Sequence, residues 1–286
     1  MGRFDSGVVW GAKAGHLVYR GLHKATFYGW CPRWGRGRSL FDWRTSMLSQ
    51  LLLSLLPPVI YRAPLWLFRR LRHGGLPTLP TEFRKVRRGH HGLYKLINDY
   101  SFDTVLDIGA GAGAHAAILH ASRKAVTALD FGTSVYAEHR SSSVPWQRVD
   151  IDFFDFTPEA AFDCVWACHV LEHQTDPGAF IRRCIALTKP DGIIAITVPP
   201  LKHRIVGGHL SLWNAGLLLY QLTFNGLDTR DAAICSYGYN VSVIVRNTAR
   251  PPVSLDHDKG DLLRLKPFMP AFVDEPFEGR IHRWNW

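Results

Sequence analysis

A glycine-rich turn follows a short apolar segment near residue 104, and its residue types could bind a ligand that contains a nucleotide. The turn reads Asp107-Ile-Gly109-Ala-Gly111-Ala-Gly113. Glycines permit a tight turn and let backbone N–H groups approach a ligand, and the N-terminus of a following helix adds a favourable dipole. Because Gly109, Gly111 and Ala114 also satisfy the dinucleotide fingerprint, the turn alone does not distinguish between adenosine-containing cofactors.

Two acidic residues beside the turn narrow the choice of ligand. Asp107 stands two residues before the first glycine, where it would meet the backbone of the turn or an ammonium group of the ligand. A dinucleotide has no positive group at that place. Asp130 ends the next apolar segment, 23 residues after Asp107, and is placed to accept both ribose hydroxyls of an adenosine. Asp130 suits both S-adenosylmethionine and NAD, so it predicts an adenosine ligand without choosing between them.

Three further motifs follow in a fixed order. They are Val170-Leu171-Glu172-His173, Asp176-Pro177 and Lys189-Pro190-Asp191-Gly192. Together with the glycine turn, this order resembles the class I S-adenosylmethionine-dependent methyltransferases, and within them the small-molecule type 11 group. The resemblance covers roughly residues 100–248. It implies S-adenosyl-L-methionine as the cofactor and a doubly wound, Rossmann-like α/β fold.

The resemblance also implies roles for individual residues. Asp107 and the turn glycines would hold the methionine part of the cofactor, and Asp130 would bind the ribose. An acid after the third strand would meet the adenine amino group, and both Asp150 and Asp152 are candidates. The segment around His169 would line the cofactor near the sulfonium, although His169 could also be a half-buried histidine with a structural role. The predicted cofactor-binding residues are Asp107, Gly109, Gly111, Gly113, Asp130, Asp150, Asp152 and His169.

Methyl transfer to a hydroxyl needs a group that takes up a proton, and histidine titrates near neutrality. The candidates are His169, His173, His203 and His209. His209 is preferred, because related enzymes often carry a histidine followed by an aromatic residue between the fifth strand and the next helix. Its alternative role is packing at the start of that helix, near Ser211. We therefore predict His209 and His169 as the catalytic residues.

Alternation of short β-like segments with helical patterns predicts a mostly parallel, seven-stranded sheet that closes with an antiparallel hairpin. Each strand before the hairpin is expected to be followed by a helical step. The expected strands span residues 104–108, 125–130, 146–151, 162–167 and 193–198, with the hairpin at 232–236 and 240–246. The expected helices span residues 114–122, 177–187 and 212–222.

The chain divides into three stretches of different character. Residues 1–88 are basic and rich in aromatic residues, residues 89–248 hold the motifs, and residues 249–286 are expected to be a tail or flap. The first 100 residues carry a balance of +13 charges and the remainder −3. A basic segment of this kind suits an anionic partner. We expect a small-molecule acceptor of anionic or sugar-linked character, such as a glycan precursor in surface-polysaccharide assembly.

Other functions are consistent with parts of the pattern. The basic N-terminus alone favours an RNA-modifying methyltransferase, a partner class that we do not prefer. A non-catalytic protein or an NAD-dependent protein that binds adenosine is a further alternative, and Asp107 argues against the NAD-dependent one. The residues 51–68 form the most apolar stretch, but prolines and an arginine interrupt it, so it predicts peripheral membrane contact and not a span. The five cysteines form neither a zinc motif nor a disulfide framework, so we expect no metal and a cytoplasmic location.

Overall fold

The computed structural model describes residues 75–133, 135 and 139–286. Its centre is an eight-stranded sheet in the order β3-β2-β1-β4-β5-β7-β6-β8. β1 to β5 pair in parallel, whereas β7, β6 and β8 pair with their neighbours in antiparallel fashion. The strands are β1 (Thr104–Ile108), β2 (Ala125–Asp130), β3 (Gln147–Asp150), β4 (Phe162–Cys168), β5 (Thr188–Val198), β6 (Ala233–Tyr237), β7 (Asn240–Arg246) and β8 (Arg283–Trp284).

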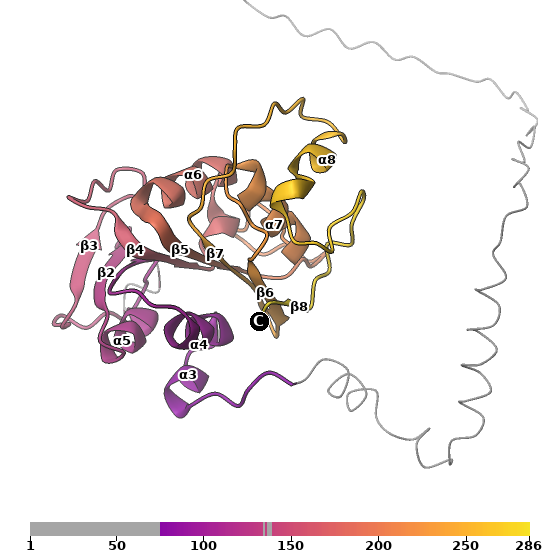
Figure 1. Cartoon of the computed structure of the whole chain (residues 1–286). Coiled ribbons are helices and arrows are strands. Elements are labelled where there is room, and N and C mark those ends of the chain that lie inside the picture. The colour runs from indigo at the N-terminus through magenta and orange to yellow at the C-terminus, as the bar shows by residue number, and fades with distance from the viewer. Residues whose placement is uncertain (1–74, 134, 136–138) are drawn as a thin grey trace, which may run out of the picture. The chain divides into compact units, whose positions relative to one another are not determined.

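Helices cover both faces of this sheet (Figure 1). On one face lie α3 (Thr81–Lys85), α4 (His90–Asp99) and α5 (Ala114–Ala121), and on the other lie α6 (Pro177–Leu187) and α7 (Ala215–Phe224). The short helices η3 (Leu171–His173), α8 (Asp261–Leu265) and η4 (Lys266–Phe268) complete the described elements. The mostly parallel, doubly wound α/β fold expected from the sequence is therefore confirmed.

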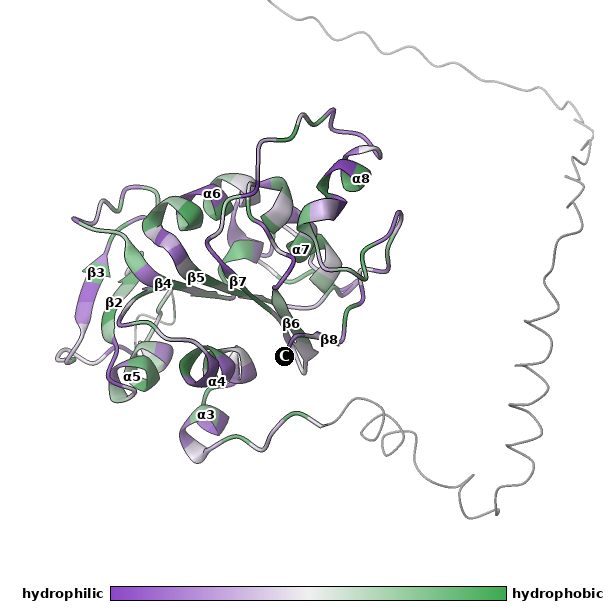
Figure 2. Ribbon diagram, in the orientation of Figure 1, coloured by the Kyte–Doolittle hydropathy of each residue, from purple (hydrophilic) through white to green (hydrophobic). Residues whose placement is uncertain are grey.

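Each face of the sheet packs against its own layer of helices. Along β1, Leu106 and Ile108 belong to the buried cluster that includes Phe180 of α6, while Val105 belongs to the cluster that includes Leu93 of α4. Strands buried on both faces have to be apolar along nearly their whole length. In Figure 2, the edge strand β3 is mostly purple, in keeping with its sequence QRVD. Within the described strands, the buried residue that carries an ionisable acid is Asp107 of β1.

The chain order of the strands reverses between β1 and β4. From β1 the chain first moves to β2 and β3 on one side and then returns to β4 on the other side. In open α/β sheets, ligands bind at such a switch point, outside the carboxyl ends of the strands. The register pairs Ile108 of β1 with both Leu129 and Ala167, so the ends of these strands meet at one edge of the sheet.

Several boundaries differ from the sequence prediction. The sheet has eight strands and not seven, because β8 pairs with β6. β5 begins at Thr188 instead of residue 193, because residues 188–192, which were expected outside the strand, stay in the sheet through an irregular register, with Asp191 in a left-handed conformation. The amide of Asn247 donates to the carbonyl oxygens of Thr188 and Lys189 there.

Two helix expectations were also wrong. α7 begins at Ala215 instead of residue 212, because Asn214 is the N-cap and its side chain accepts from the N–H of Leu217. The connection from β3 to β4 contains turns and no helix, so that strand is not followed by a helical step. The closing hairpin and the helix that ends at Leu187 were predicted correctly.

The basic stretch of the sequence lies mostly outside the described residues. The apolar residues 51–68, for which peripheral membrane contact was predicted, belong to that part, so this contact stays a prediction. Within the described ranges, no helix combines the length and the apolar character that crossing a membrane requires. The last stretch, residues 249–286, contributes α8 and the edge strand β8.

Candidate cofactor and acceptor site

The glycine turn leaves β1 in a conformation that few other residues could adopt. Gly109, Gly111 and Gly113 all have positive φ angles, of 68°, 53° and 83°. A Cβ atom on Gly109 would lie 2.4 Å from Cγ2 of Val170, which follows β4. Glycine at position 109 is therefore needed both for the backbone angle and for the close approach of two neighbouring strand ends.

Asp107 is buried next to this turn, and its carboxyl group is only partly hydrogen bonded. It is 1% exposed, and its Oδ2 atom has no hydrogen-bond partner. Burial is the main reason why the pKa of the Asp107 carboxyl is raised to about 8; a backbone hydrogen bond at Ala116 opposes the shift, and the nearby Asp130 carboxylate adds to it. A cationic group placed beside Asp107 would supply the partner that this carboxylate lacks.

Asp130 ends β2 beside the same turn. Its Oδ2 accepts from the N–H of Gly111 at 2.8 Å, and its Oδ1 accepts from the N–H of Gly132 at 3.0 Å. The carboxylate is thereby oriented by backbone donors on both sides. Ala110, Gly111, Gly113 and Asp130 line a narrow pocket together with Trp146, whose ring lies 3.0 Å from the place of a Cβ on Gly113.

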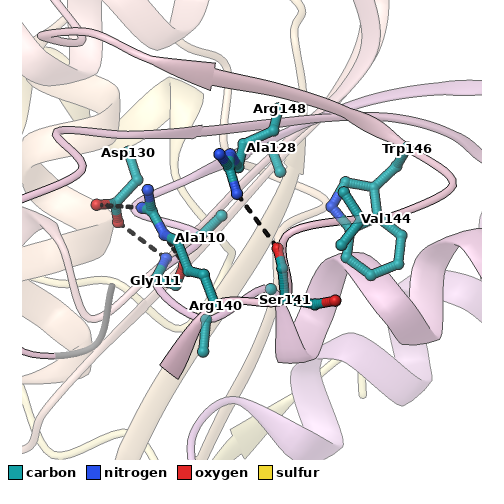
Figure 3. A pocket seen from close by; sticks show the side chains of 11 residues that line it. Ala110, Gly111, Ala128, Asp130, Arg140, Ser141, Val144, Trp146 and Arg148 are labelled. Carbon is teal, nitrogen blue, oxygen red and sulfur yellow. Dashed lines mark hydrogen bonds and ion pairs between the residues drawn. The ribbon is translucent and has the colours of Figure 1, made fainter. Parts of the chain in front are cut away.

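Arg140 also lines this pocket (Figure 3). Its guanidinium forms ion pairs with Asp130 and with Asp150, both at 2.6 Å, and its Nε donates to the carbonyl oxygen of Gly111 at 2.7 Å. Asp150 is thus connected to Asp130 through one arginine. Asp152, the other candidate for an adenine contact, instead accepts from the N–H of Phe154 within a turn.

His169 is held by hydrogen bonds at both ring nitrogens. Nδ1 lies 2.9 Å from a guanidinium nitrogen of Arg88, and Nε2 lies 3.0 Å from Oδ1 of Asn240. Because arginine can only donate, Nδ1 is the acceptor and Nε2 carries the proton. In this arrangement His169 has no free lone pair with which to take a proton from an acceptor.

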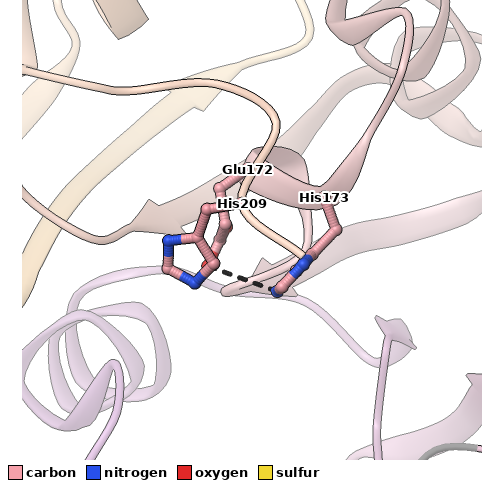
Figure 4. Close-up of side chains that lie close together, drawn as sticks. All are labelled: Glu172, His173 and His209. Carbon is pink, nitrogen blue, oxygen red and sulfur yellow. Dashed lines mark ion pairs between the residues drawn. The ribbon is translucent and has the colours of Figure 1, made fainter. Parts of the chain in front are cut away.

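His209 lies close to Glu172 and His173, so residues far apart in sequence meet (Figure 4). The N–H groups of Leu210 and Ser211 donate to the carbonyl oxygen of Glu172, which fixes the loop after β5 against η3. Partial burial lowers the pKa of His209, and the charge of Glu172 opposes that shift. His209 is therefore mostly a neutral imidazole near pH 7. His203, on the same loop, is exposed and outside this group.

The predicted residues thus form two groups at one edge of the sheet. The first surrounds the glycine turn and includes Asp107, Asp130 and Asp150, and the second contains His209 beside Glu172, which was not predicted as a site residue. Arg140, Trp146 and Arg88 were missed in the sequence. Arg140 stands in a polar segment without periodicity, Trp146 opens the expected strand 146–151 with nothing to mark it as a site residue, and Arg88 lies in the basic stretch, so no local pattern separated them from other surface residues.

Comparison with known proteins also identifies a methyltransferase domain in this chain. A family model described as a methyltransferase domain matches residues 106–196, which include the glycine turn, β4 and most of β5. These residues form a methyltransferase domain of the type 11 group. Members of this class I family use S-adenosylmethionine.

The relatives of the methyltransferase domain carry the names of different methyltransferases. A ubiquinone biosynthesis O-methyltransferase from a Bradyrhizobium species is 34% identical over 109 residues, which cover 36% of this chain and 42% of that protein. A trans-aconitate 2-methyltransferase of Escherichia coli O157:H7 is 31% identical over 99 residues, or 34% of this chain and 39% of that protein. The chain therefore spans less than half of the length of these relatives.

One solved structure aligns over a longer part of the chain. It is a 1,6-didemethyltoxoflavin-N1-methyltransferase of Burkholderia thailandensis, at 18% identity, with 76% of this chain and 94% of that chain covered. Its TM-score is 0.47.

The strain at Gly109 can be tested by a single methyl group. In Gly109→Ala, the positive φ angle and the contact with Val170 should together lower the free energy of unfolding by about 2 kcal/mol or more. Gly207→Ala is the matched control, because a Cβ there meets nothing within 4 Å. Urea denaturation of both variants checks this, and equal stabilities would contradict the described turn.

Proposed function

We propose that this protein transfers a methyl group from S-adenosylmethionine to a hydroxyl of a small-molecule acceptor. The observation that carries the proposal is the pair of acids at the glycine turn. Asp130 presents an oriented carboxylate where a ribose could bind, and Asp107 presents a buried carboxyl whose Oδ2 has no hydrogen-bond partner. The cofactor would bring both a ribose and an ammonium group to these two places.

The residues present fit the parts of that cofactor. Gly109–Gly113 and Asp107 would hold its methionine part, Asp130 its ribose, and Asp150 is the better placed of the two adenine candidates because it lies beside Asp130. When bound, the cofactor supplies a methyl group that its sulfonium has already activated. The chain must then align an acceptor hydroxyl with that methyl group, exclude water and receive one proton.

His209 supports the part of the proposal that concerns the acceptor hydroxyl. It lies beside the buried carboxylate of Glu172, its lowered pKa keeps it neutral near pH 7, and it follows β5 at the same sheet edge as the glycine turn. We assign activation of the acceptor hydroxyl to His209. His169 is assigned a positioning role instead, because both of its nitrogens are already hydrogen bonded.

Titration calorimetry of the full chain with S-adenosylhomocysteine tests the cofactor directly. We expect binding at one site, no binding of NAD, and a loss of at least about tenfold in affinity in Asp130→Ala, because a ribose-binding carboxylate is removed. Asp152→Ala is the control, since the side chain of Asp152 is bound within its own turn. Binding of NAD instead of S-adenosylhomocysteine would overturn the proposal.

Arg140 should compete with the cofactor for Asp130. Since its guanidinium occupies the carboxylate that the ribose needs, Arg140→Ala should bind S-adenosylhomocysteine more tightly, by about tenfold or about 1.4 kcal/mol. Arg148→Ala, which alters another cation that lines the same pocket, should have a smaller effect. If Arg140→Ala binds more weakly than the unchanged protein, Arg140 holds the cofactor and does not exclude it.

The raised pKa of Asp107 makes cofactor binding depend on pH. With a pKa of about 8, the buried carboxyl is mostly protonated at pH 7, whereas a bound ammonium group favours the ionised form. Binding should therefore release a proton, and affinity should increase from pH 6.5 to pH 8 by up to about tenfold per pH unit. In Asp107→Asn this slope should disappear; an unchanged slope would show that another group titrates.

The chemical class of the acceptor is the most specific part of the proposal. The basic balance of residues 1–100 supports an acceptor that is anionic or linked to a sugar. A screen with the full chain and radiolabelled S-adenosylmethionine should find transfer to carboxylate-bearing or nucleotide-linked acceptors, at rates that fall with added salt. Transfer confined to neutral acceptors, with no dependence on salt, would contradict this choice.

A further inference from the structure

Three side chains with metal-binding chemistry meet beyond the ends of β4 and β5. Glu172 and His173 come from η3, after β4, and His209 comes from the loop after β5 (Figure 4). One ligand atom from each side chain lies within 4.8 Å of the others. The two backbone hydrogen bonds from Leu210 and Ser211 to Glu172 hold the loop in this position.

Glu172 is a buried carboxylate without a compensating donor. The residue is 0% exposed, and neither Oε1 nor Oε2 has a hydrogen-bond partner. Nδ1 of His169 lies 3.2 Å from Oε1, but its lone pair already accepts from Arg88, so it has no proton to donate. A charge removed from water in this way is costly unless a cation binds to it.

The orientation of His173 is typical of a histidine that binds a metal. Its Nδ1–H donates to the carbonyl oxygen of Gly208 at 2.7 Å, which leaves the lone pair on Nε2, 3.9 Å from Oε1 of Glu172. Metal-ligating histidines commonly donate their other N–H to a carbonyl, because this fixes the tautomer and the ring. The ring of His209 packs edge-on against the ring of His173, with centroids 5.0 Å apart.

We propose that Glu172, His173 and His209 bind a divalent transition-metal ion, with Zn²⁺ the ion that best suits two imidazoles and one carboxylate. Three protein ligands of this kind leave a coordination position open, as in catalytic zinc sites. The role of the ion rests on the proposed function. At the acceptor side, its charge would lower the pKa of a bound acceptor hydroxyl, whose proton would pass to water. His209 would then activate that hydroxyl through the ion that it binds, in place of taking the proton itself.

A second group of possible ligands does not share these features. Asp256, Asp258 and Asp261 also lie close together, but the first two are exposed. Asp261 accepts from two backbone N–H groups and pairs with Arg264. The Asp261 carboxylate therefore already has its partners. Glu172 was not predicted as a metal ligand from the sequence, because His209 lies 37 residues further along the chain.

Cobalt titration of the full chain tests the proposal. The purified protein is freed of metal with a chelator, titrated with Co²⁺ and monitored by visible absorption, and Zn²⁺ is then added as a competitor. We expect one equivalent of Co²⁺ with an intense low-coordinate spectrum that Zn²⁺ abolishes. His209→Ala and the isosteric Glu172→Gln should each weaken binding about 10- to 100-fold. His203→Ala, an exposed histidine on the same loop, should leave it unchanged.

Two results would overturn the metal site. One is the absence of stoichiometric Co²⁺ binding. The other is an affinity for Co²⁺ that is the same in His209→Ala and Glu172→Gln as in the control His203→Ala. S-adenosylhomocysteine titration of the same samples separates this inference from the proposed function. Cofactor binding without metal binding refutes the metal site alone, whereas metal binding without cofactor binding refutes the proposed function and leaves the site in place.

Discussion

The close approach of the ends of β1 and β4 at Gly109 is the constraint on which the rest of the site depends. Any side chain at this position would overlap Val170, and the positive φ angle turns the chain toward Asp130 on β2. The N–H of Gly111 then reaches the Asp130 carboxylate. One backbone reversal thus places Asp107, Asp130 and the segment that begins at His169 around a common edge of the sheet.

Buried acidic groups give this edge its chemical character. Asp107 and Glu172 are both buried and have carboxyl oxygens without hydrogen-bond partners, while the charge of Asp130 is balanced by the side chain of Arg140. Groups of this kind are stabilised most by ligands that carry positive charge. The proposed cofactor, with its ammonium and sulfonium, and the proposed metal ion would therefore each supply positive charge to a buried acid at the same edge of the sheet.

The sequence predicted the fold and the gathering of the glycine turn with Asp107 and Asp130 because their signals are local. The turn glycines, Asp107 and Asp130 are marked by position relative to apolar strands, and parallel pairing brings them together. The beginning of β5 was predicted wrongly, since the distant Asn247 satisfies its irregular backbone. Arg140 and the meeting of His209 with Glu172 depend on loops whose paths no periodicity encodes, and these contacts needed the structure.

A crystal structure of the full chain with S-adenosylhomocysteine would test the central claim most directly. The account predicts that the ligand lies across the ends of β1, β2 and β4, with both ribose hydroxyls on Asp130, the ammonium group beside Asp107, and Arg140 moved away from Asp130. A bound ligand elsewhere, or one that leaves the ion pair between Arg140 and Asp130 intact, would contradict it.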